Sequence, residues 1–192
     1  MPRAGLSRDA VVGIAVELVD ADPETPLTLA AVATRAGVAV PSLYKHVRSL
    51  DALRDGVALA GVEGVTAAVR AATAGLTGAE ALLGAGRAIR AYARRHPGLY
   101  AASQPAPGRE ASPELAAAAG RAVEAVAAVV RQAGLPVERT VDAVRILRAA
   151  VHGFILLEAA GGFGLPDDVE ASYERLLAVL WEGLGVLRAS AS

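Results

Sequence analysis

The segment from Thr28 to Leu53 constrains the fold of this chain more than any other part of it. Threonine begins a short run with apolar residues at helical spacing, Gly37 interrupts that run, and a second short run leads to Ser49. Threonine and serine cap helix starts through their hydroxyl oxygens, and glycine adopts the left-handed turn that ends a helix. The pattern predicts a helix, a tight turn, a second helix over roughly Val40 to Val47, and the start of a longer helix.

The same segment offers positive charge and no negative charge. No Asp or Glu occurs between Thr28 and Ser49, whereas four cationic or titratable side chains do: Arg35, Lys45, His46 and Arg48. Because DNA presents phosphates and base edges, a helix-turn-helix without acids is typical of a DNA-reading element. The alternative is an ordinary solvated helix, and the combination of spacing and charge favours DNA.

The second helix of this pair separates apolar from polar side chains. Leu43 and Val47 lie four residues apart, so we expect both to pack inward. The polar residues around them are then left on or near the outer face, where they suit phosphates and base edges: Ser42, Tyr44, Lys45 and His46.

Composition favours an all-α protein. The chain is 54% hydrophobic with only 4% aromatic residues, and helix formers dominate it. We expect a three-helix head with the helix-turn-helix over residues 1–50 and a helical bundle for ligand binding and dimerisation over residues 51–192. Since the formal net charge is −1, affinity for DNA must come from a local patch.

Several classes of function are disfavoured. The absence of cysteine excludes disulfides, thiolate zinc sites and cysteine nucleophiles, and we expect no cofactor and no metal. No histidine has a glutamate three residues before it, and the common nucleophile, phosphate-loop and zinc-protease motifs are missing, so we do not expect an enzyme. The chain shows no apolar signal core or uninterrupted apolar span, which predicts a cytoplasmic protein.

The last two expected helices predict a homodimer. One begins at Pro136 and the other at Asp167, and each carries apolar residues on more than one face. A single small bundle cannot cover so much apolar surface, so four helices from two chains are expected to meet. The residues assigned to this interface are Val151, Ile155, Tyr173, Leu176, Leu180 and Leu184.

The helices after Gly78 are expected to enclose a largely apolar pocket for a small apolar or amphipathic effector. Candidate lining residues are aromatic, with one histidine, and ordinary core packing is the alternative for each: Tyr92, Tyr100, His152, Phe154, Phe163 and Trp181.

The head, from Leu6 to Ala60, resembles the DNA-binding domain of TetR-type transcriptional regulators. The residues that carry the resemblance are Thr28, Val32–Ala33, Ala36–Gly37–Val38, Leu43–Tyr44–Lys45–His46 and Ser49–Leu53. The resemblance implies a ligand-responsive repressor that binds a palindromic operator as a homodimer. It also implies that Thr28 binds a phosphate, and that the residues facing the major groove and flanking backbone are Pro41, Ser42, Tyr44, Lys45 and His46.

Three residues depart from the family pattern. Ala39 stands where a capping serine is usual, Val47 replaces a phenylalanine, and Leu50 replaces a lysine at the start of the next helix. These departures keep open an alternative function, a helical small-molecule-binding or interaction protein whose DNA-binding head is weakened or lost.

The carboxy-terminal half resembles one subgroup of these regulators, which is named for a Trp-His-Gly signature. The run Val151–His152–Gly153–Phe154 and the segment from Arg95 to Tyr100 carry this resemblance. Arg148 and Ala149 stand where the tryptophan is expected, so the match to the signature is incomplete.

Overall fold

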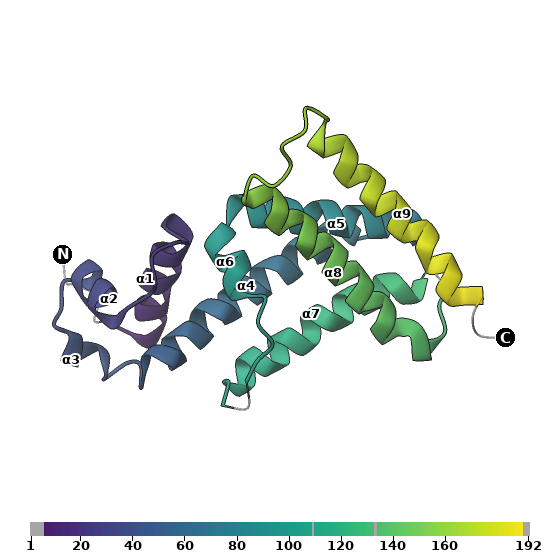
Figure 1. The fold of residues 1–192 in the computed structure, drawn as a ribbon. Helices are drawn as coiled ribbons and strands as arrows, with labels where there is room; N and C mark the ends of the chain where they lie inside the picture. The colour runs from purple at the N-terminus through teal and green to yellow at the C-terminus, as the bar shows by residue number, and fades with distance from the viewer. Residues whose placement is uncertain (1–5, 109, 133, 190–192) are drawn as a thin grey trace. The chain divides into compact units, whose positions relative to one another are not determined.

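The structure is a computed structural model that describes residues 6–108, 110–132 and 134–189 (Figure 1). All regular secondary structure in these ranges is helical, which confirms the all-α prediction. Among the described residues, no helix combines the length and the apolar character needed to span a membrane.

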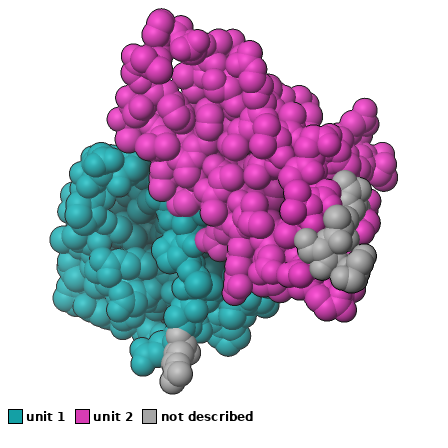
Figure 2. Space-filling view, turned by 45° about the vertical axis from the view of Figure 1, so that its right-hand side comes forward, with its two compact units in different colours: residues 1–64, 96–120 teal, residues 65–95, 121–192 magenta. Residues whose placement is uncertain are grey.

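The chain forms two compact units (Figure 2). Unit 1 comprises residues 1–64 and 96–120, and unit 2 comprises residues 65–95 and 121–192. Two helices, α4 (Leu50–Thr73) and α7 (Pro113–Gln132), each contribute residues to both units. The domain division predicted after residue 50 does not coincide with these two units, and it stays a prediction.

Unit 1 begins with three short helices, α1 (Arg8–Ala21), α2 (Leu29–Ala36) and α3 (Val40–Leu43). The starts of α1 and α2 are both capped, because Ser7 Oγ accepts the Ala10 N–H at 3.1 Å and Thr28 Oγ1 accepts the Ala31 N–H at 3.1 Å. Each bond satisfies a backbone donor that has no partner within its own helix.

The turn between α2 and α3 depends on Gly37. Its φ is 68°, a left-handed conformation that a Cβ would disfavour, and the next residue, Val38, donates its N–H to the Ala33 carbonyl at 3.0 Å. This arrangement closes α2 in the way common for helix ends with glycine. The predicted helix-turn-helix therefore forms.

The second helix of the motif is shorter than predicted. α3 ends at Leu43, and the chain continues as a tight turn in which the N–H groups of His46 and Val47 both donate to the Leu43 carbonyl, at 2.8 and 2.9 Å. Ala39 supplies no side-chain cap. A side-chain cap stabilises a helix start by about 1 kcal/mol, and α3 forms without that contribution.

The connection after residue 95 contains a helix that was not predicted. α5 (Gly78–Arg95) ends directly before His96, and Pro97 opens α6 (Pro97–Ala102). Proline is well suited to the first helical position because its missing N–H is not needed there. α6 packs closely on α1: a Cβ on Gly98 would lie 2.0 Å from the Val19 carbonyl oxygen.

The core of unit 1 confirms the inward packing predicted for Leu43 and Val47, which are both buried. They join residues of α1, α2 and α4 in this core: Val11, Ala15, Val32, Ala33, Leu53 and Val57.

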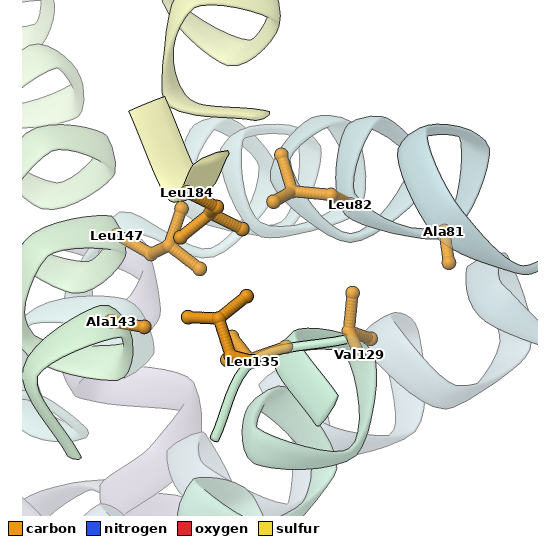
Figure 3. Packing of buried hydrophobic residues seen from close by; sticks show 8 residues of the cluster. Ala81, Leu82, Val129, Leu135, Ala143, Leu147 and Leu184 are labelled. Carbon is orange, nitrogen blue, oxygen red and sulfur yellow. The ribbon is translucent and has the colours of Figure 1, made fainter. Parts of the chain in front are cut away.

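Unit 2 is built on α5, the second part of α7, α8 (Thr140–Ala159) and α9 (Val169–Ala189), with a short 3-10 helix at Val137–Arg139 before α8. In Figure 3, Leu82, Leu147 and Leu184 point into one shared space. The buried core cluster is Ala81, Leu82, Val129, Val130, Leu135, Ala143, Leu147 and Leu184.

Candidate nucleic-acid interface

The recognition segment, which we define as residues 40–48, presents its polar side chains at the surface of unit 1. Tyr44 is 56% exposed, and Lys45 is exposed beside it. Burial of Leu43 and Val47 on either side turns these two outward. Of the other predicted DNA-binding residues here, Pro41 and Arg48 are exposed, and Ser42 and His46 are half-buried.

Thr28 is also exposed, at the amino-terminal end of α2. Its Oγ1 accepts the Ala31 N–H, so the hydroxyl proton is left to donate to another acceptor. The positive end of the helix dipole lies at the same place and favours an anionic partner. The geometry suits the phosphate contact that the family resemblance implied.

Arg35 lies in a different setting from the other predicted DNA-binding residues. Its Nη2 is 3.2 Å from Glu17 Oε2 on α1, and both side chains are more than half exposed. The pairing with Glu17 was not predicted from the sequence, because nothing local marks two residues on different helices as partners. An exposed ion pair of this kind contributes little and exchanges readily with other partners.

A polar groove of about 380 Å³ lies directly beside the recognition segment. It joins the start of α1, the end of the recognition segment, the first turns of α4 and the start of α7, and its lining is Arg8, His46, Val47, Arg48, Ala52, Asp55, Ser112, Pro113 and Glu114. No local sequence pattern predicts this groove, since its walls come from parts of the chain that are far apart in sequence.

One hydrogen bond fixes the wall of the groove that α7 provides. The Ser112 N–H donates to Asp55 Oδ2 on α4 at 2.9 Å, and Ser112 Oγ accepts the Leu115 N–H at 3.2 Å as the cap of α7. The start of α7 is thereby held next to the residues that follow the recognition segment.

The six residues predicted to line an effector pocket lie in several settings. Tyr100 is buried in α6 of unit 1, and the others belong to unit 2. Trp181 packs against the core cluster, and Tyr92 is half-buried on α5. The pKa of His152 on α8 is lowered by burial and by the charge of Arg148, which favours the neutral imidazole. The assignment of these residues to an effector pocket stays a prediction.

Phe154 and Phe163 do meet, in a cluster around a buried arginine. Their ring centroids are 4.6 Å apart, and Phe154 also lies 4.9 Å from Tyr173. The guanidinium of Arg90, which is 3% exposed, lies 4.6 Å from the Tyr173 ring centroid. Tyr173 completes the cluster by donating its hydroxyl proton to the Gly86 carbonyl at 2.7 Å.

Two carboxylates neutralise Arg90. Its Nε and Nη2 donate to the two oxygens of Glu158 at 2.8 and 2.7 Å, and its Nη1 lies 2.8 Å from Glu170. Hydrogen bonds from Arg90, with a further one from Arg94, lower the pKa of Glu158 to about 2 although burial opposes this shift. Sequence reasoning missed this network, which joins α5, α8 and α9.

The residues predicted for a dimer interface are mostly interior. Val151, Ile155, Tyr173 and Leu184 are buried within the single chain, so they have no surface to offer a partner, and their assignment is corrected to core packing. Leu176 and Leu180 are half-buried. The large exposed apolar side chains of the same two helices were not assigned: Val141, Ile146, Leu156, Leu157, Val179 and Val186.

Comparison with known proteins extends over most of the chain. The family described as "Tetracyclin repressor-like, C-terminal domain" matches residues 82–180. An uncharacterised HTH-type transcriptional regulator of Mycobacterium tuberculosis is 36% identical over 167 residues, which cover 87% of this chain and 75% of that relative.

Solved structures with the same fold match most of the chain. A protein of unknown function from Rhodococcus has a TM-score of 0.79 at 23% identity, covering 95% of this chain and 98% of that one. The TetR family protein ActR of Streptomyces coelicolor, in complex with (S)-DNPA, has a TM-score of 0.70 at 20% identity, with coverage of 95% and 98%.

None of these matches carries the Trp-His-Gly designation, so that subgroup stays a prediction. The family match spans more than half of the chain, and the mycobacterial relative shares more than a third of its residues over the aligned length. The chain belongs to the TetR family of HTH-type transcriptional regulators.

Proposed function

We propose that this chain is a ligand-responsive repressor that binds a palindromic operator as a homodimer. The observation that carries the proposal is the recognition segment, in which exposed Tyr44 and Lys45 stand between buried Leu43 and Val47 in a stretch without acids. Two such segments, one from each subunit, would enter successive major grooves about 34–36 Å apart and so block access of polymerase.

The proposed roles follow from the chemistry of each side chain. Tyr44 and Lys45 read base edges or bind adjacent phosphates, since a phenol and an ammonium group suit both. The Thr28 hydroxyl donates to a phosphate at the start of α2. Supporting contacts to the groove and backbone come from Pro41, Ser42, His46 and Arg48, and from Arg35 once a phosphate replaces Glu17.

We further propose that a small apolar or amphipathic effector binds among the helices of unit 2. The largely apolar packing of α5, α7, α8 and α9 supports this, as does the bound ligand of the related ActR structure. His152 and Phe154 are the first residues to substitute in a search for the site. A difference in effector affinity between two states, typically about 1–3 kcal/mol, would shift the DNA-binding equilibrium.

The family consists of regulators, and we propose that this member acts on DNA in the cytoplasm without a catalytic role. The alternative is a small-molecule-binding protein with a weakened head. Two observations favour that alternative: Ala39 leaves α3 without a side-chain cap, and Leu50 offers no cation at the start of α4.

Binding to the DNA upstream of the chain's own gene, measured over a range of salt concentrations, separates the two proposals. A regulator should prefer that DNA over a scrambled duplex, and its affinity should fall steeply with salt because bound phosphates release counterions. Equal, weak binding to both duplexes at low salt would favour the alternative.

A further inference from the structure

The polar groove beside the recognition segment contains charges of both signs. Arg8 and Arg48 bring guanidinium groups and His46 an imidazole, whereas Asp55 and Glu114 bring carboxylates. Cations next to a recognition segment are what a DNA backbone requires, but carboxylates at the same place repel phosphate. The presence of Asp55 and Glu114 next to a DNA-binding segment therefore requires an explanation.

The two acids differ in what holds them. Asp55 is half-buried and accepts the Ser112 N–H at 2.9 Å, so it has a structural partner in unit 1. Glu114 is exposed in the first turn of α7. The pKa of Glu114 is lowered first by its own backbone N–H, then by the Ser112 side chain, and the charge of Arg8 adds to this. Glu114 is thus an ionised, accessible carboxylate that shares the groove with Arg8.

Arg8 lies in the first turn of α1, where an anion other than the Glu114 carboxylate can also reach it. Its side chain is exposed, and an exposed ion pair between Arg8 and Glu114 would be weak enough to exchange.

We propose that Glu114 competes with DNA phosphate for Arg8, so that the first turn of α7 restrains DNA binding by the recognition segment. This rests on the DNA-binding function proposed above and adds a regulatory element to it. α7 continues into unit 2, where Val129 and Val130 belong to the core cluster.

The test is a double-mutant cycle on DNA affinity with E114Q, R8A and the double variant. Glutamine keeps the size and hydrogen-bonding capacity of Glu114 and removes its charge. Affinity of E114Q for the operator or for any duplex at low salt should rise by about two- to fivefold, the range that an exposed ion pair is worth. In the R8A background the same substitution should have little effect.

E110Q is the matched control, because Glu110 is exposed in the same connection and the described lining of the groove does not include it. Circular dichroism melts would show that all variants fold. The proposal would be overturned if E110Q raised DNA affinity as much as E114Q does. It would also be overturned if E114Q raised DNA affinity equally in the R8A background. If neither the natural chain nor E114Q binds any DNA, both the proposed DNA-binding function and the proposed role of Glu114 are wrong.

Discussion

Lys45 carries the only ammonium group among the side chains of this protein, and it lies exposed at the end of the recognition segment. An ammonium bound to phosphate acts on every DNA sequence alike, because the phosphate carries no base information. Lys45→Ala should therefore weaken binding to specific and scrambled duplexes together, and the slope of log affinity against log salt should fall by about 1.

Arg70→Ala is the control for Lys45→Ala, because Arg70 is an exposed cation of unit 2 and should leave the slope unchanged. An unchanged slope for Lys45→Ala would remove this residue from the phosphate contacts. Loss of binding to the specific duplex alone would instead assign Lys45 to a base edge.

The inward and outward sides of the recognition segment were predictable from the sequence, whereas its length was not. Leu43 and Val47 are four residues apart, and this spacing alone placed them in the core and Tyr44 and Lys45 outside. α3 ends at Leu43, and residues 44–47 contain no glycine or proline that would mark this end in the sequence. The pairing of Arg35 with Glu17 depends on how α1 packs against α2, and no local sequence pattern predicts that packing.

At the scale of elements, α6 shows how one residue supports two interpretations. Proline cannot continue a helix because it has no N–H, and the same missing N–H makes Pro97 a good first residue for α6. The closeness of α6 to α1 gives a test: a Cβ on Gly98 would lie 2.0 Å from the Val19 carbonyl oxygen. Gly98→Ala should therefore lower the unfolding free energy by about 1–3 kcal/mol, measured by urea titration.

Gly13→Ala is the matched control, since Gly13 lies within α1 and a Cβ there would meet nothing within 4 Å. Alanine in a helix is favoured over glycine, so this variant should gain about 0.5–1 kcal/mol. Equal effects of the two substitutions would contradict the close packing of α6 on α1.

The network around Arg90 links α5, α8 and α9 and gives a second test at this scale. Glu158→Gln removes one carboxylate from a buried guanidinium and should lower the unfolding free energy at pH 7 by about 3 kcal/mol. The pKa of Glu158 lies at about 2 in the folded chain, below its ordinary value of 4.5. The stabilisation is therefore complete above about pH 4.5 and lost as the pH falls toward 2.

Urea titrations of the natural chain and of Glu158→Gln, at pH 7 and in acid, measure the difference in their unfolding free energies. This difference should shrink as the pH falls below 4.5. Glu124→Gln, which breaks the exposed pair with Arg131, should change stability little at either pH. A difference for Glu158→Gln that is constant with pH would mean that the ionised carboxylate is not what stabilises the three helices.

At the scale of the whole molecule, the two terminal helices limited what the sequence could predict. α8 and α9 carry apolar residues on more than one face, and periodicity alone does not decide which face the chain covers itself. The structure buries Val151 and Leu184 and leaves Val179 and Val186 both 67% exposed. Apolar surface of this kind on two long helices is what a partner chain would cover.

The proposed homodimer therefore depends on the exposed residues of α9 rather than on its interior ones. Val179→Arg and Val186→Arg add charge at surface positions, so each subunit should stay folded while association is lost, because an interface would have to bury an unpaired charge. Leu184→Arg puts the same charge into the core and should unfold the chain. Light scattering after gel filtration gives the mass, and circular dichroism gives the fold. Dimers that persist in both surface variants would move the interface away from this face of α9, and monomers of the natural chain would refute the homodimer itself.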